Sequence, residues 1–154
     1  MMKKTAALIL SLVLILSCLS FSLAETVAEE AAVIPQPVAA ESVQDFIGEW
    51  EMSGMIYSGT YLTMADMLAN KIITENSTRS LTVTEDAAVL TYLGQSMNFT
   101  AEMNPEDGTL VLTNETSICI LSLLDDGTLG MKEKSTDDST QLVDLTVVFS
   151  KTGD

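Results

Sequence analysis

Histidine is absent from the 154 residues of this chain. Its absence excludes a histidine-based catalytic triad, the usual zinc ligand sets and a side chain that ordinarily titrates near neutral pH. No sequence motif indicates a metal site or a cofactor, so we expect neither. The sequence therefore favours a protein that is not an enzyme.

Cysteine is almost as scarce, with Cys18 near the N-terminus and Cys119 in an apolar run. A chain cleaved beyond Cys18 keeps one thiol and forms no internal disulfide. We interpret Cys119 as a small buried side chain. An intermolecular bridge or a reactive thiol are the alternatives, although no histidine is present to activate that thiol.

Basic residues are few, seven against 22 acidic ones, for a formal net charge of -15. Lys3 and Lys4 are two of the seven, so the rest of the chain is more acidic still. This balance repels phosphate backbones and anionic lipid surfaces, which disfavours nucleic acid as a partner. We interpret the acidic excess mainly as a source of solubility. Binding of a cationic partner or of loosely held divalent ions is the alternative interpretation.

The N-terminus has the order of a secretory signal peptide. Lys3 and Lys4 precede the apolar run 6–16, and Ser22-Leu23-Ala24 supplies small residues just before Glu25. We therefore expect a signal peptide over residues 1–24 and a secreted, extracellular protein.

Two alternatives to free secretion remain. Ile15-Leu16-Ser17-Cys18 resembles the lipobox of bacterial lipoproteins, and cleavage before Cys18 would lipidate that thiol and anchor the protein to the cell envelope. The uncharged run 5–24 is also long enough, at about 20 residues, to cross a bilayer uncleaved. Any contact with a membrane is expected through the leader or a lipid anchor alone.

Residues 25–44 are rich in Ala, Glu and Val and contain Pro35 and Pro37. The prolines interrupt helix formation and no apolar face is sustained. We expect a flexible linker here, followed by one domain over residues 45–154.

The domain opens with an alternating pattern that predicts a strand. The side chains expected on its inner face are Trp50, Met52, Gly54 and Ile56. A short helix should follow, because Thr63 and Asp66 have the spacing of a capping box. Its apolar stripe, which consists of Met64, Met67, Leu68 and Ile72, indicates core packing or a plug over the mouth of a barrel.

Seven further strands are expected, at residues 79–85, 87–93, 96–103, 109–113, 117–124, 128–134 and 141–150. The strand 117–124 is apolar on both faces, which indicates a strand that is covered on both sides or that lies against the helix. The sequence Glu106-Asp107-Gly108-Thr109-Leu110 recurs as Asp125-Asp126-Gly127-Thr128-Leu129, which predicts two hairpins of similar build.

Eight short antiparallel strands in chain order, with one short helix after the first, predict an all-β, up-and-down barrel. A flattened sandwich is the competing architecture. An eight-stranded barrel has an interior that side chains fill or that holds one small ligand.

Gly48-Glu49-Trp50, preceded by Phe46 and Ile47, resembles the G-x-W signature that opens lipocalins and the shorter bacterial lipocalin-like domains. The resemblance implies a barrel whose floor the tryptophan closes. The family's late Thr-Asp-Tyr turn is missing, as is the arginine near the last strand that packs over the tryptophan. We hypothesise that Lys151 packs over the tryptophan in place of this arginine. The two departures favour the looser bacterial lipocalin-like domains over the ligand-carrying lipocalins.

Our first functional hypothesis is a monomeric binding module for a small hydrophobic ligand, because methionines suit an adaptable pocket. The residues expected to line the barrel interior are Trp50, Met52, Met97, Phe99, Met103 and Met131. The alternative is a structural domain with a filled core that binds an envelope protein and no ligand.

Pairs of neighbouring acidic residues are the last candidates for chemistry. They are Glu85-Asp86, Glu106-Asp107, Asp125-Asp126 and Asp137-Asp138. Each pair falls in an expected turn or loop, where acidic residues are common for local reasons. We therefore assign no catalytic residue and no calcium site.

Overall fold

The structure, a computed structural model, describes residues 33–135 and 144–153. The expected leader with Cys18, residues 25–32 of the expected linker and the start of the expected strand 141–150 lie outside the described residues. The elements are β1 Pro37–Val38, η1 Val43–Asp45, β2 Gly48–Tyr57, β3 Thr60–Thr63, α2 Met64–Ala69, η2 Glu75–Ser77, β4 Arg79–Val83, β5 Ala87–Tyr92, β6 Gln95–Asn104, β7 Thr109–Thr113, β8 Ser117–Leu124, β9 Leu129–Ser135 and β10 Leu145–Thr152.

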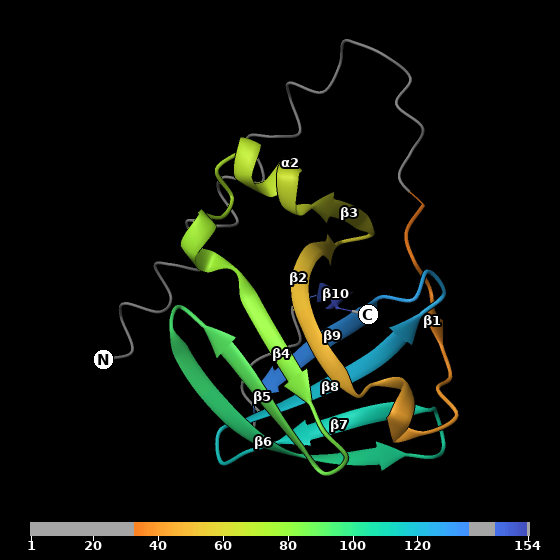
Figure 1. Ribbon diagram of the computed structural model, residues 1–154. Helices are drawn as coiled ribbons and strands as arrows, with labels where there is room; N and C mark the ends of the chain where they lie inside the picture. The colour runs from red at the N-terminus through yellow and green to blue at the C-terminus, as the bar shows by residue number, and fades with distance from the viewer. Residues whose placement is uncertain (1–32, 136–143, 154) are drawn as a thin grey trace. The chain divides into compact units, whose positions relative to one another are not determined.

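Eight of the strands form a closed antiparallel barrel (Figure 1). The order around the barrel is β2, β4, β5, β6, β7, β8, β9 and β10, and β10 then pairs with β2. Each strand thus lies beside its neighbours in the chain, and β3 and β1 are attached to β2 and β8. The predicted up-and-down barrel is confirmed, and the sandwich is not observed.

The period-two pattern of the strands buries one side chain in two inside the barrel. Leu81 and Val83 of β4, Leu110 and Leu112 of β7 and Leu121 of β8 are buried in a single apolar cluster. Their alternate neighbours on each strand are more exposed. The core therefore occupies the barrel axis.

Strand β2 departs from the expected alternation halfway along its length. In the pairing with β10, Phe149 lies opposite Met52 and Val148 lies opposite Gly54, so Ser53 is an extra residue. Such a bulge reverses which side chains face inward. Met55 packs against the core in place of Ile56, so the inward placement expected for Ile56 was wrong, whereas Gly54 is buried as expected.

Strand β8 is buried on one face along most of its length. Cys119 and Leu121 are fully buried, whereas Ile120 between them is 37% exposed. The prediction that this strand is covered on both sides was therefore wrong. Only its last two residues gain a further neighbour, since Leu123 and Leu124 pair with β1.

The chain joins the fold earlier than the boundary expected at Asp45. Residues 34–45, which we call the strap, cross the end of the barrel at which β2 begins, and we call this the strap end. Gln36 and Asp125 exchange two hydrogen bonds, and the amide of Ala40 donates to the carbonyl oxygen of Gly108 at 3.2 Å. Ala40 is buried in the core. The part of the expected linker that the structure describes is thus packed onto the barrel.

Trp50 is buried near the strap end, and the indole Nε1 donates to the carbonyl oxygen of Phe46 at 2.9 Å. Lys151 pairs with Trp50 across β2 and β10, and its Nζ lies 5.4 Å from the centre of the ring. Gly48 leaves room for this lysine, because a Cβ at that position would lie 2.8 Å from Lys151 Cε. The hypothesis that Lys151 packs over Trp50 is confirmed.

The repeated sequence forms two turns with the same hydrogen bonds. Asp107 Oδ1 accepts from the amide and hydroxyl of Thr109, and Asp126 Oδ1 accepts from the same groups of Thr128. The glycine between them has a positive φ in both turns. Local side-chain chemistry therefore explains these acidic pairs, as expected.

Helix α2 lies at the other end of the barrel, which we call the helix end (Figure 1). Thr63 and Asp66 form the predicted capping box. The helix ends at Ala69, and the amide of Ile72 then bonds the carbonyl oxygen of Met67, as in a Schellman motif. Met67 belongs to the core and Met64 and Ile72 pack against it, so these three side chains serve core packing, whereas Leu68 of the expected stripe is exposed.

The two repeated turns provide a matched test of the strap. Gly108 and Gly127 have φ of 68° and 83°, but a Cβ on Gly108 would lie 2.7 Å from the amide nitrogen of Ala40, and one on Gly127 would have no neighbour within 4 Å. We expect Gly127→Ala to cost about 1–2 kcal/mol through backbone strain alone. Gly108→Ala should cost at least about 1 kcal/mol more in urea unfolding. Equal losses would contradict a packed strap.

Lys151→Met tests the contact over Trp50, because it keeps the aliphatic chain and removes the charge. We expect a loss of about 0.5–1 kcal/mol, the value of a cation–π contact at an exposed site. Urea unfolding followed by circular dichroism measures it. Lys132→Met on β9 removes the same charge from another exposed residue and should change stability less. A similar effect of both variants would assign the loss to net charge.

Candidate functional site

All six residues expected to line a ligand cavity lie inside the barrel. Trp50, Met52, Phe99 and Met131 are buried, and Met97 and Met103 are half-buried and pack against the same core. Their placement inside the barrel is confirmed. Their role in binding a ligand stays a prediction.

These side chains are part of a filled core. Phe46, Phe149 and Leu129 are fully buried in contact with the same cluster. A protein interior of this kind is close-packed, so a ligand placed among these side chains would have to displace some of them. The space for a ligand is better sought at the rim of the barrel.

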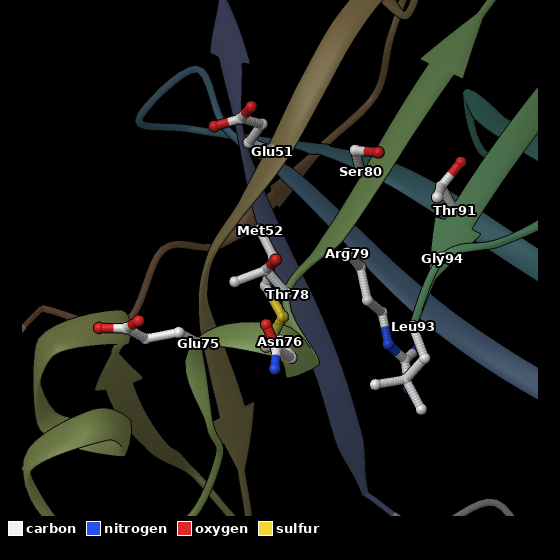
Figure 2. A pocket seen from close by; sticks show the side chains of 10 residues that line it. All are labelled: Glu51, Met52, Glu75, Asn76, Thr78, Arg79, Ser80, Thr91, Leu93 and Gly94. Carbon is white, nitrogen blue, oxygen red and sulfur yellow. The ribbon is translucent and has the colours of Figure 1, made fainter.

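A cleft opens at the helix end, where β2 and β4 part. Their pairing runs from Gly48 with Val83 to Glu51 with Ser80 and goes no further, because β2 then pairs with β3. The cleft has a volume of about 670 Å³. It is lined by Glu51, Met52, Glu75, Asn76, Thr78, Arg79, Ser80, Thr91, Leu93 and Gly94 (Figure 2).

Arg79 is the basic residue of the cleft, and two neighbours hold it. The register of β4 and β5 pairs Arg79 with Tyr92, and the guanidinium lies 4.7 Å from the centre of the Tyr92 ring. Arg79 Nη1 also lies 3.8 Å from Glu133 Oε2 of β9. The positive charge of Arg79 is therefore already balanced within the protein.

Leu93 forms the tip of the hairpin between β5 and β6 and borders the cleft. Both residues of this two-residue turn have positive φ, 52° at Leu93 and 73° at Gly94. The turn favours Asn-Gly or Asp-Gly, whereas a leucine in that conformation is strained. Leu93 is also 58% exposed, so neither local geometry nor core packing explains this leucine.

Glu51 and Glu75 place two exposed carboxylates on the cleft. Among the described residues, neither side chain forms an ion pair or a hydrogen bond. With Arg79 balanced by Glu133, the cleft has a net negative character. In Figure 2, Glu51 lies above Met52, Glu75 lies at the lower left with its carboxylate pointing away from Met52, and Leu93 lies on the right beside Arg79.

Sequence reasoning missed most of this cleft. Of the six interior residues predicted to bind a ligand, Met52 borders it. One signal was present in the sequence, the dipeptide Leu93-Gly94 in a position where a tight hairpin favours asparagine or aspartate before glycine.

Cys119 is fully buried, and burial raises the pKa of its thiol from 9.0 to about 12. The neighbouring Glu133 adds to this rise, and Arg79 opposes it. The thiol is therefore protonated at neutral pH and is a poor nucleophile. This supports the interpretation of Cys119 as a core side chain.

Within residues 33–135 and 144–153, no three Cys, Asp or Glu side chains gather closely enough to hold a metal ion. None of the helices in these ranges combines the length and the apolar character needed to cross a membrane.

The fold and the cleft define a class of protein, a closed eight-stranded up-and-down barrel with a cleft in its wall near one end. Comparisons with protein-family models, curated proteins and solved structures found no match to this chain.

The raised pKa of Cys119 predicts a pH dependence of stability. The folded protein holds the thiol proton up to about pH 12, and the unfolded chain releases it near pH 9. The stabilising contribution is thus complete below pH 9 and is lost as the pH rises toward 12. We expect the free energy of unfolding of Cys119→Ala to fall less steeply over this range than that of the original protein. Parallel pH profiles would contradict the assignment.

Proposed function

We propose that this protein is a small β-barrel binding module, secreted or anchored to the cell envelope, that takes a small ligand in the cleft between β2 and β4. The observation that carries the proposal is the cleft itself. Its volume of about 670 Å³ falls in the usual range for small-molecule sites, about 300–1,000 Å³. Its lining is mainly polar, and Met52 and Leu93 are the apolar side chains in it.

We infer that the barrel is of the lipocalin-like type. Three features support this inference: the up-and-down strand order, Gly48-Glu49-Trp50 at the start of β2, and a basic side chain of the last strand over the tryptophan. A fold of this type does not by itself define a ligand, so the ligand has to be argued from the cleft.

Export is the part of the proposal that rests on sequence. Lys3 and Lys4, the apolar run 6–16 and Ser22-Leu23-Ala24 support cleavage after Ala24, and Cys18 supports lipidation as the alternative. In either form the barrel would act outside the cytoplasm.

The filled interior supports a second function, an envelope domain that binds another protein and no ligand. The six predicted interior residues pack within the core, as this alternative requires. We favour the ligand-binding function because the strained and exposed Leu93 lies beside the cleft.

Leu93→Asn separates the role of this residue in binding from its role in folding. Asparagine suits the turn, so we expect the free energy of unfolding to rise by about 1 kcal/mol. Loss of the apolar contact should lower the affinity for a ligand by about fivefold or more. Thermal shift with a panel of small amphipathic molecules, fatty acids, retinoids and haem identifies a ligand, and calorimetry then compares the affinities.

Ser58→Asn is the matched control. Ser58 and Gly59 form another two-residue turn with positive φ, 47° and 75°, outside the residues that line the cleft. This change should leave ligand affinity as it was. Failure of every ligand to stabilise the protein would favour the interaction domain, and equal binding by the original protein and Leu93→Asn would remove the cleft as the site.

A further inference from the structure

We propose that Arg79 and Glu133 form a gate between the cleft and the barrel interior, and that this gate opens while the ring of strands stays folded. The inference goes beyond the proposed function, because it concerns access to the interior and holds whether or not the cleft binds a ligand.

Both side chains belong to the inner face of the barrel. Arg79 lies two residues before the buried Leu81 on β4, and side chains two residues apart on a strand share a face. Glu133 lies directly opposite the buried Cys119 in the pairing of β8 with β9, and opposite residues also share a face. The ion pair therefore lies inside the ring of strands, at its rim.

The pair bridges two strands that are not neighbours. β2 and β10 separate β4 from β9 in the ring, and yet Arg79 Nη1 lies 3.8 Å from Glu133 Oε2. The guanidinium also contacts Tyr92 of β5, whose ring centre lies 4.7 Å away. β4 begins at Arg79 and β5 ends at Tyr92, so these side chains lie at the helix end. Together the three side chains extend across this opening of the barrel.

The cleft lies on one side of this ion pair and the core lies on the other. Arg79 is one of the residues that line the cleft (Figure 2). Cys119 is fully buried in the core, and Glu133 raises the pKa of its thiol whereas Arg79 lowers it, so both charges lie near the sulfur. A molecule that passes from the cleft toward Cys119 would therefore have to displace the ion pair.

The ion pair is weak enough to open. Charge-assisted hydrogen bonds between nitrogen and oxygen are about 2.7–2.9 Å long, and this contact is longer, at 3.8 Å. The Glu133 side chain is 49% exposed, so water can replace Arg79 as its partner. Exposed ion pairs shift an equilibrium by up to about fivefold. Local openings of this kind require less free energy than global unfolding of the barrel.

Labelling of Cys119 by methyl methanethiosulfonate, followed by mass spectrometry, measures the opening. Cys18→Ser in the full chain leaves Cys119 as the single thiol. We expect a labelling rate that barely changes at low urea, because a local opening exposes little surface. Added salt should increase the rate, because it screens an exposed ion pair. A rate that follows the urea dependence of global unfolding from the lowest concentrations would overturn the gate.

Two variants separate the gate from a direct effect of charge on the thiol. Glu133→Gln and Arg79→Gln each remove one partner, and either change should increase the labelling rate by up to about fivefold. A direct effect would have opposite signs in the two variants, because the reagent attacks the thiolate and the two charges shift the thiol pKa in opposite directions. Faster labelling of Glu133→Gln with slower labelling of Arg79→Gln would therefore contradict the proposal.

Glu115→Gln is the matched control. Glu115 is exposed in the turn between β7 and β8, at the same end of the barrel, and its removal leaves the ion pair in place. This variant should label at the rate of the Cys18→Ser protein, and an acceleration equal to that of Glu133→Gln would assign the effect to net charge and overturn the gate. Urea midpoints of all the variants complete the test. Faster labelling at an unchanged midpoint supports local opening, whereas acceleration that only follows a loss of stability overturns it.

Discussion

The pairing of β2 with β10 is the constraint on which the rest of this molecule depends. It joins strands from opposite ends of the domain through eight residue pairs and turns a sheet of consecutive hairpins into a ring. A ring has no free edge strands, so the barrel avoids the exposed backbone groups that promote aggregation. The same pairing sets Lys151 over Trp50 and fixes the bulge at Ser53, which redirects the second half of β2.

Strand lengths then create the cleft. β2 has ten residues and β4 has five, so β4 accompanies only the first part of its neighbour. The second part of β2 turns back on itself through β3, and the chain returns to the barrel wall by way of α2 and η2. The wall is therefore incomplete beside Met52 and Arg79, and the side chains around that gap line the cleft.

Much of the fold could be predicted from the sequence, because alternating apolar residues and Gly-rich turns determine strands locally. The strand 109–113 and the capping box of Thr63 and Asp66 are examples. The bulge at Ser53 could not be predicted from the sequence, since it depends on the register with a strand almost a hundred residues away. The strap was missed because backbone hydrogen bonds and one buried alanine hold it, without any periodic pattern. The cleft results from unequal strand lengths, and Leu93 was its one local sign.

The strap determines how mechanical force would enter the barrel. A pull on the chain before Val33 first loads the two hydrogen bonds between Gln36 and Asp125, and then the short pairing of β1 with β8. The next contact to bear the load is the hydrogen bond from the amide of Ala40 to the carbonyl oxygen of Gly108. The packing of the buried Phe46 follows it. These contacts would yield in sequence, while the ring of eight strands remains closed. Tension on the chain before Val33 would thus lengthen it at the strap end and leave the cleft at the helix end intact.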